Sequence, residues 1–200
     1  MTDARVLFVR HGAHAVVGER LCGRTPGFSL SDLGRRQAEA LAERLARDAP
    51  RAVYTSPVTR AQETASVIAA ASGLEPVVAE AIDEIDFGAW AGRTFAELDA
   101  EPAWRLWNAD RARRRPPGGE SMAETQARVA SWLDDVRDDH AGAAVVAVSH
   151  ADVIKAAVAY ALGLSLHFYD RFEIAPGSLT TLVHGDAGWT LSSINEAPHG

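Results

Sequence analysis

The sequence predicts an α/β protein, a three-layer α/β/α sandwich with a mostly parallel central sheet. Short apolar segments of strand length, such as Val6-Leu7-Phe8-Val9 and residues 143–148, are typical of strands buried on both faces of a parallel sheet. Segments with helical apolar spacing alternate with these strands, which favours βαβ connections. No linker, repeat or low-complexity tract interrupts the chain, so we expect a single domain over residues 1–200.

The N-terminal segment carries clear strand and helix signals. The apolar run from Ala4 to Val9 is expected to form the first strand, and a Gly-rich, aperiodic loop follows it. Ser31 is expected to cap a helix that runs to about Arg47, because a Ser hydroxyl can accept a hydrogen bond from a free amide of the first turn. Apolar spacing predicts the buried face of this helix: Leu33, Ala38, Leu41, Ala42 and Leu45.

Residues 51–79 repeat the pattern of strand and helix. A second strand is predicted over residues 51–55, and Ser56-Pro57 is expected to open a helix with Pro in its first turn. Gly73 marks the end of this helix, and a third short strand is expected over residues 76–79. The residues predicted to face inward on the helix are Ala61, Ala65, Ile68 and Ala69.

Residues 86–120 have a different composition and predict a small helical cap. The segment contains Trp90, Trp104 and Trp107 among charged residues, and it ends in a Pro-Pro-Gly-Gly stop at residues 116–119. We expect two short helices, with the tryptophans packed inside the cap rather than stacked on nucleic-acid bases. The arginines at 111 and 113–115 are expected to lie in solvent, with steering of an anionic substrate as the alternative.

The C-terminal part completes the predicted sandwich. Ser121 and Glu124 form a capping box at the start of a helix that extends to about His140. A strand over residues 143–148 then leads through Ser149-His150 into a helix ended by Gly163. A terminal hairpin is predicted from two strands joined by a Gly-rich turn, residues 179–184 and 189–194.

Composition and charge exclude several classes of protein. The formal net charge of −7 argues against general nucleic-acid binding. No apolar run has the length of a membrane span, and the first strand begins too early to leave room for a signal peptide. Cys22 is the only cysteine, so an internal disulfide and a cysteine metal cluster are both excluded. We expect a cytoplasmic protein that binds neither nucleic acid nor membranes, and a homodimer is compatible with this sequence.

Reactive side chains follow the predicted strands. Arg10-His11 and His150 come at the ends of predicted strands, Arg60 lies in the first turn of the helix after the second strand, and Glu84 lies in the segment after the third strand. Ligands of open α/β sheets bind beyond the carboxyl ends of the strands, so we expect these side chains to converge on one crevice.

These residue types suit phosphoryl transfer. Arginines hold phosphate oxygens through charge-assisted, fork-shaped hydrogen bonds. A neutral imidazole can attack phosphorus to form a phosphohistidine. A carboxylic acid can protonate the departing oxygen and later take a proton from water. Such a set can work without a metal or another cofactor, and we expect none here.

Five segments, in this order along the chain, resemble the signature of the histidine phosphatase superfamily, also called the phosphoglycerate mutase-like fold. They are residues 7–12 (LFVRHG), residues 56–65 from Ser56-Pro57 through Arg60 to Thr64-Ala65, residues 84–92 (EIDFGAWAG), residues 118–121 (GGES) and residues 148–150 (VSH). The resemblance implies that His11 is the nucleophile and that Glu84 is the general acid and base. It also implies that the phosphoryl group is bound by Arg10, Arg60 and His150, and that Ser121 lies at the edge of the pocket. Gly12 and Arg24 are further candidate substrate contacts.

The chain departs from the family pattern in two places. Many relatives carry Glu or Gln after Arg-His-Gly, and an Asn a few residues later that contacts phosphate, whereas residues 13–17 here read AHAVV. His14 and Arg24 are the candidates to replace this contact. Ala151-Asp152 follows the second catalytic histidine, where relatives often have Gly.

The resemblance implies a metal-independent, histidine acid phosphatase-type enzyme that hydrolyses small phosphorylated metabolites through a phosphohistidine. One alternative is a cofactor-dependent phosphoglycerate mutase, which the short segment between Glu84 and Gly118 disfavours. Another is a non-catalytic phospho-ligand binder on the same fold. The presence of His11, Arg60, Glu84 and His150 disfavours this alternative.

Overall fold

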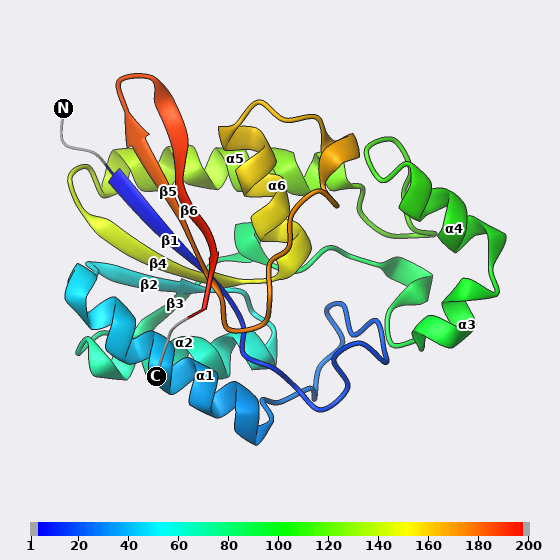
Figure 1. Ribbon diagram of the computed structural model, residues 1–200, viewed down its shortest axis with the longest axis horizontal. Helices are drawn as coiled ribbons and strands as arrows, with labels where there is room; N and C mark the ends of the chain where they lie inside the picture. Colours follow the sequence, from blue (N-terminus) through cyan, green and yellow to red (C-terminus); the bar gives the residue numbers. More distant parts are fainter. Residues whose placement is uncertain (1–3, 198–200) are drawn as a thin grey trace.

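The computed structural model describes residues 4–197 and contains a six-stranded sheet in the order β3-β2-β4-β1-β5-β6 (Figure 1). The first four strands are parallel to one another: β1 (Ala4–Arg10), β2 (Ala52–Thr55), β3 (Pro76–Val78) and β4 (Ala144–Ser149). The hairpin of β5 (Leu179–Gly185) and β6 (Gly188–Glu196) pairs antiparallel to β1 through β5. The predicted α/β architecture with a mostly parallel sheet is confirmed.

Two pairs of helices cover the two faces of the sheet (Figure 1). On one face lie α1 (Asp32–Leu45) and α2 (Thr59–Ala71), and on the other lie α5 (Met122–Asp139) and α6 (Ala151–Ala161). Both faces of β1 are buried, which explains why its sequence does not alternate between apolar and polar residues. Leu7 and Val9 pack into the cluster with α1 and α2, whereas Val6 and Phe8 pack into the cluster with α5 and α6.

The helix starts follow the predicted caps, with two corrections. The Ser31 hydroxyl accepts a hydrogen bond from the Gly34 amide at 3.2 Å, and Ser121 with Glu124 forms a complete capping box. Leu33, however, is 52% exposed, so its prediction as a core residue is wrong. α2 begins at Thr59, so Pro57 precedes the helix instead of lying in its first turn.

The helical cap is present and has a core of its own. It contains α3 (Phe95–Asp99) and α4 (Pro102–Ala109), which lie apart from the sheet layers (Figure 1). Trp90 and Trp107 are almost fully buried with ring centroids 5.6 Å apart, which confirms the predicted packing role. Arg111 corrects the prediction of solvated arginines, because its guanidinium lies 3.9 Å from the Trp107 ring centre and 2.9 Å from the Asp152 carboxylate. Over residues 4–197, no helix is both long and apolar enough to cross a membrane.

Candidate active site

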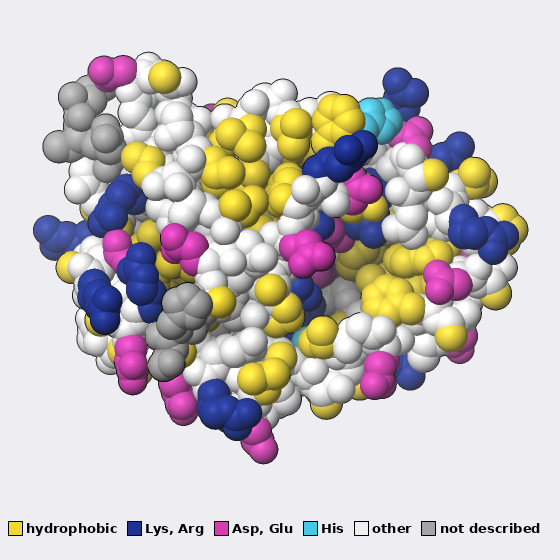
Figure 2. Space-filling model, in the orientation of Figure 1, with side chains coloured by type: hydrophobic (Ala, Val, Ile, Leu, Met, Phe, Trp, Pro, Cys, Tyr) yellow, Lys and Arg dark blue, Asp and Glu magenta, His cyan; other side chains and the backbone are white. Residues whose placement is uncertain are grey.

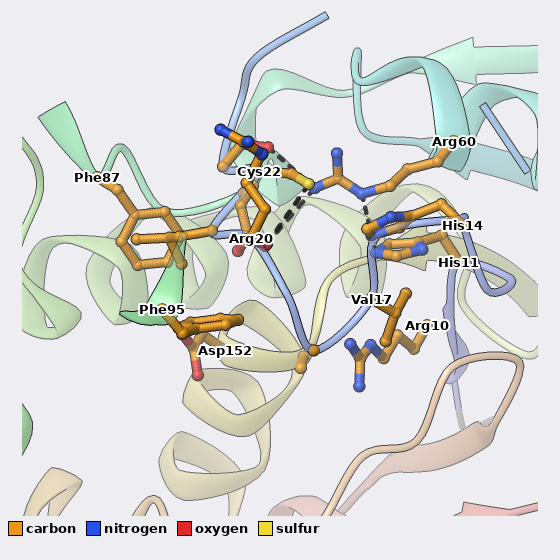
Figure 3. Close-up of a pocket in the computed structure, with 15 residues that line it drawn as sticks. Arg10, His11, His14, Val17, Arg20, Cys22, Arg60, Phe87, Phe95 and Asp152 are labelled. Atoms are coloured by element: carbon orange, nitrogen blue, oxygen red, sulfur yellow. Dashed lines mark hydrogen bonds and ion pairs between the residues drawn. The ribbon is translucent and has the colours of Figure 1, made fainter. Parts of the chain in front are cut away.

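A cavity of about 160 Å³ lies at the carboxyl ends of β1 and β4, beside the cap. Four of the five predicted catalytic side chains line it: Arg10, His11, Arg60 and Glu84. Figure 3 shows Arg10, His11 and Arg60 on one side of the cavity, with Phe87 and Phe95 on the other. The space-filling view shows a hollow between the sheet layers and the cap (Figure 2). The structure therefore brings four of these five side chains to one cavity, whereas His150 is not among the residues that line it.

His11 is held as a neutral ring by hydrogen bonds at both nitrogens. Its Nδ1 lies 2.8 Å from the Gly12 carbonyl oxygen, and Arg60 Nε–H donates to its Nε2 at 3.0 Å. Since a carbonyl can only accept, the proton is on Nδ1 and the lone pair is on Nε2. Burial, together with the charges of Arg60 and Arg10, holds the pKa of His11 well below its usual value. The side chain therefore presents an unprotonated nitrogen at neutral pH.

Buried Arg60 and half-buried Arg10 bring two guanidinium groups to the cavity that His11 lines. Arg60 is 2% exposed, and its Nη2 donates to the Gly23 carbonyl at 2.9 Å, while Arg10 Nη1 donates to the Ile174 carbonyl at 2.6 Å. Within residues 4–197, Arg60 Nη1 and Arg10 Nε are buried without a hydrogen-bond partner. Buried donors of this kind are costly when unpaired, so their placement indicates a site for an oxygen-rich anion.

His150 is fully buried behind Arg60. Its Nδ1 lies 3.2 Å from Arg60 Nη2, and its Nε2 lies 2.8 Å from the Ser56 hydroxyl. The ring centres of His11 and His150 are 5.1 Å apart. Burial, followed by the charge of Arg60, holds the pKa of His150 well below its usual value, so this ring is also neutral without a ligand.

Glu84 supplies a carboxyl group that holds a proton near neutral pH. Burial, followed by the negative charge of Asp152, raises its pKa from 4.5 to about 7, although the charge of Arg60 opposes this shift. Its Oε2 lies 3.6 Å from His150 Nδ1 and 3.9 Å from Arg60 Nη2. A carboxyl with such a pKa can both donate and accept a proton at neutral pH, which general acid–base chemistry requires.

Three other predicted contacts are engaged within the protein. The Gly12 amide donates to the Thr64 hydroxyl at 3.1 Å. Arg24 Nε donates to the Glu84 carbonyl at 2.7 Å, and Ser121 caps α5. None of the three is among the residues that line the cavity. Their contact with substrate stays a prediction, as do the catalytic roles of the other residues.

Several residues that line the cavity were not predicted. Phe87 and Phe95 come from the segment preceding and forming the cap, Arg20 and Leu21 come from the loop after β1, and Asp152 lies in the first turn of α6. The only signal for Asp152 was its position two residues after His150. His14, the suggested substitute for the absent Asn, does line the cavity, and burial lowers its pKa to about 4. Among residues 4–197, no group of three or more His, Cys, Asp or Glu side chains is arranged to hold a metal ion.

Comparison with curated proteins finds relatives along the whole chain. The chain is 38% identical over 199 residues to a bifunctional protein of Mycobacterium tuberculosis, in an alignment that covers 98% of this chain and 54% of that protein. It is 37% identical over 155 residues to phosphoserine phosphatase 1 of Hydrogenobacter thermophilus, covering 75% of this chain and 74% of the relative. The chain thus spans about half the length of the mycobacterial relatives that it matches.

Solved structures agree with the curated relatives. The complex of mycobacterial glucosyl-3-phosphoglycerate phosphatase with inorganic phosphate superposes with a TM-score of 0.85 at 30% identity, covering 97% of this chain and 98% of the other. Residues 6–197 match the sequence model of the histidine phosphatase superfamily (branch 1). With the fold and the convergent site described above, this match shows that the chain belongs to the histidine phosphatase superfamily, branch 1.

Proposed function

We propose that this protein is a phosphatase that hydrolyses small phosphomonoesters through a phosphohistidine at His11. One observation supports this function most strongly. The unprotonated Nε2 of His11 accepts a hydrogen bond from Arg60 Nε–H, and two buried arginine nitrogens from residues that line the same cavity, Arg60 Nη1 and Arg10 Nε, have no partner within residues 4–197. A phosphoryl group would supply oxygens to these donors and phosphorus to the lone pair.

The residues account for both half-reactions. In the first, His11 Nε2 forms a bond to phosphorus while the ester P–O bond breaks, and the Glu84 carboxyl gives its proton to the departing alcohol oxygen. In the second, water attacks phosphorus and the P–N bond breaks. The Glu84 carboxylate takes a proton from that water, so both the carboxyl and the neutral imidazole are restored. Arg10, Arg60 and His150 stabilise the charge on the transferred oxygens.

The dimensions of the cavity favour a small substrate. Its volume of about 160 Å³ is below the roughly 300–1,000 Å³ of sites for drug-sized ligands. Phe87 and Phe95 offer apolar walls to the alcohol part of the ester, and Arg20 and Asp152 offer polar groups. The relative from Hydrogenobacter is named a phosphoserine phosphatase, which fits a compact phosphorylated metabolite.

The first test is hydrolysis of p-nitrophenyl phosphate in excess EDTA. We expect turnover by the wild type and none by His11→Ala, with His167→Ala as the control because His167 is exposed and outside the cavity. Activity that survives in His11→Ala would refute the phosphohistidine. With 3-phosphoglycerate as substrate, release of free phosphate supports a phosphatase, whereas 2-phosphoglycerate would identify a mutase. Binding of vanadate without turnover of any ester would identify a non-catalytic binder.

A further inference from the structure

Behind His150 lies a chain of buried polar groups that does not touch the cavity. Ser56 is fully buried, and its Oγ lies 2.8 Å from His150 Nε2. The Asp83 carboxylate is 5% exposed, and its Oδ1 lies 2.9 Å from the same hydroxyl. Neither Ser56 nor Asp83 lines the cavity. Any effect of these two residues on the reaction therefore passes through other side chains.

The chemistry of these groups fixes the direction of each hydrogen bond. Both oxygens of Asp83 face donors, since Oδ1 accepts from the Glu84 amide at 2.7 Å and Oδ2 lies 3.1 Å from Arg24 Nε, so this side chain serves as an acceptor. Ser56 must then donate its single proton to Asp83. The Ser56 oxygen also accepts from the Val58 amide at 3.2 Å, so its contact with His150 is made by a proton on Nε2.

This arrangement determines which nitrogen of His150 faces the reaction site. With the proton on Nε2, the lone pair is on Nδ1, which accepts from Arg60 Nη2 at 3.2 Å and lies 3.6 Å from Glu84 Oε2. When an arriving phosphoryl dianion draws the Arg60 Nη2–H away from Nδ1, a second proton taken from solvent adds at Nδ1 and points toward the anion. The charge that develops on the ring is stabilised through Ser56 by Asp83, as a buried carboxylate stabilises the imidazolium of a catalytic triad.

We propose that Ser56 and Asp83 are positioning residues that hold His150 with Nε2 protonated and Nδ1 directed at the phosphoryl group. The role rests on the proposed phosphatase function. Asp83 contributes in a second way, because its Oδ1 also accepts from the Glu84 amide at 2.7 Å. One carboxylate thus orients both the phosphate-binding histidine and the backbone of the general acid.

The test combines nitrogen NMR of the imidazoles with kinetics on matched variants. In the wild type, His150 Nε2 is expected to give a protonated, pyrrole-like ¹⁵N signal with a slowly exchanging proton, assigned by its loss in His150→Gln. Ser56→Ala is expected to lose this protected proton and to lower kcat/KM about 10- to 100-fold, as removal of an orienting partner behind a functional histidine commonly does. The loss is expected mainly in kcat. Ser66→Ala is the control, because the Ser66 hydroxyl donates to the Gln62 carbonyl at the surface of α2.

Asp83→Asn keeps the shape of the side chain and serves if Ser56→Ala does not fold. We expect it to shift the same proton signal and to lower kcat/KM, with near-ultraviolet circular dichroism matching the wild type. A pyridine-like Nε2 signal in the wild type would overturn the proposed positioning role of Ser56 and Asp83. A folded Ser56→Ala whose kcat/KM is within twofold of the wild-type value would overturn it as well. An inactive wild type would instead overturn the proposed phosphatase function, and with it the role of Ser56 and Asp83 in catalysis. The ¹⁵N signal of His150 would still show whether Nε2 donates to Ser56.

Discussion

Replacing Glu84 by Gln separates protonation of the leaving group from the rest of the chemistry. The amide keeps the size of the side chain but cannot give a proton to the departing oxygen. An alkyl phosphate releases a strongly basic alkoxide and needs that proton, whereas p-nitrophenyl phosphate releases a stable phenolate and does not. We therefore expect Glu84→Gln to lose far more activity toward an alkyl phosphate than toward the activated ester.

The structure gives the expected size and pH range of the effect. General acid catalysis contributes about 10²- to 10⁴-fold, so a loss of this order is expected for the alkyl ester. The pKa of Glu84 is raised to about 7, so the protonated carboxyl is lost above that pH. In the wild type, kcat/KM for the alkyl ester is then expected to fall about tenfold for each pH unit well above 7, because this parameter reports the free enzyme. Glu84→Gln is expected to show no such limb.

The assay measures kcat/KM for both esters between pH 6.5 and about 9. Glu80→Gln is the matched control, because Glu80 lies four residues earlier on the same segment and is exposed. Equal losses for the two esters would refute Glu84 as the general acid. A wild-type profile without a limb near pH 7 would refute the raised pKa as the source of its proton.

Three further predictions concern stability. The folded state raises the pKa of Glu84 from 4.5 to about 7, so the free energy of unfolding falls as pH rises through this range. Glu84→Gln does not have this loss, so between pH 4 and pH 8 its free energy of unfolding is expected to fall by about 3 kcal/mol less than that of the wild type, measured by urea denaturation. A Cβ on Gly34 would overlap the Ala13 carbonyl oxygen, so Gly34→Ala is expected to cost about 1–3 kcal/mol and lower Tm. Trp107→Ala is expected to lower the free energy of unfolding by about 3–5 kcal/mol and to raise KM, because Phe87 packs against Trp107 and lines the cavity. Leu106 is half-exposed, so Leu106→Ala is the control and is expected to leave stability and KM unchanged. An unaltered KM in Trp107→Ala would contradict the proposed effect of Trp107 on the cavity through Phe87.

Much of the fold could be predicted because local patterns and tertiary packing agree. The run Val6-Leu7-Phe8-Val9 has no polar alternation, and in the structure its side chains enter two different cores on opposite faces of the sheet. The Ser121 capping box is a purely local signal and needed no knowledge of distant residues. Strand order was not predictable, because it depends on tertiary contacts between strands that lie far apart in the sequence.

The errors have physical causes that are not local. Ser56-Pro57 was expected to open a helix with Pro57 in its first turn, but the Ser56 hydroxyl is hydrogen-bonded to Asp83 and His150, and the helix starts only at Thr59. Leu33 has helical apolar spacing, yet it lies in the first turn of α1 and is 52% exposed. Arg24 was a candidate substrate ligand, but a side chain that reaches the Glu84 carbonyl cannot be recognised without the fold.

The hydrogen bond from Arg60 Nε to His11 Nε2 has a consequence for the resting protein. It occupies the lone pair that attacks phosphorus in the proposed reaction. An incoming oxyanion competes for that guanidinium, and only its arrival frees the imidazole. The empty protein is therefore shielded: electrophilic reagents such as diethyl pyrocarbonate, and adventitious transition-metal ions, meet a histidine whose reactive nitrogen is already covered. In the proposed reaction, reactivity is thus coupled to occupancy, because the arginine proposed to bind the phosphoryl group also covers the proposed nucleophile before the substrate arrives.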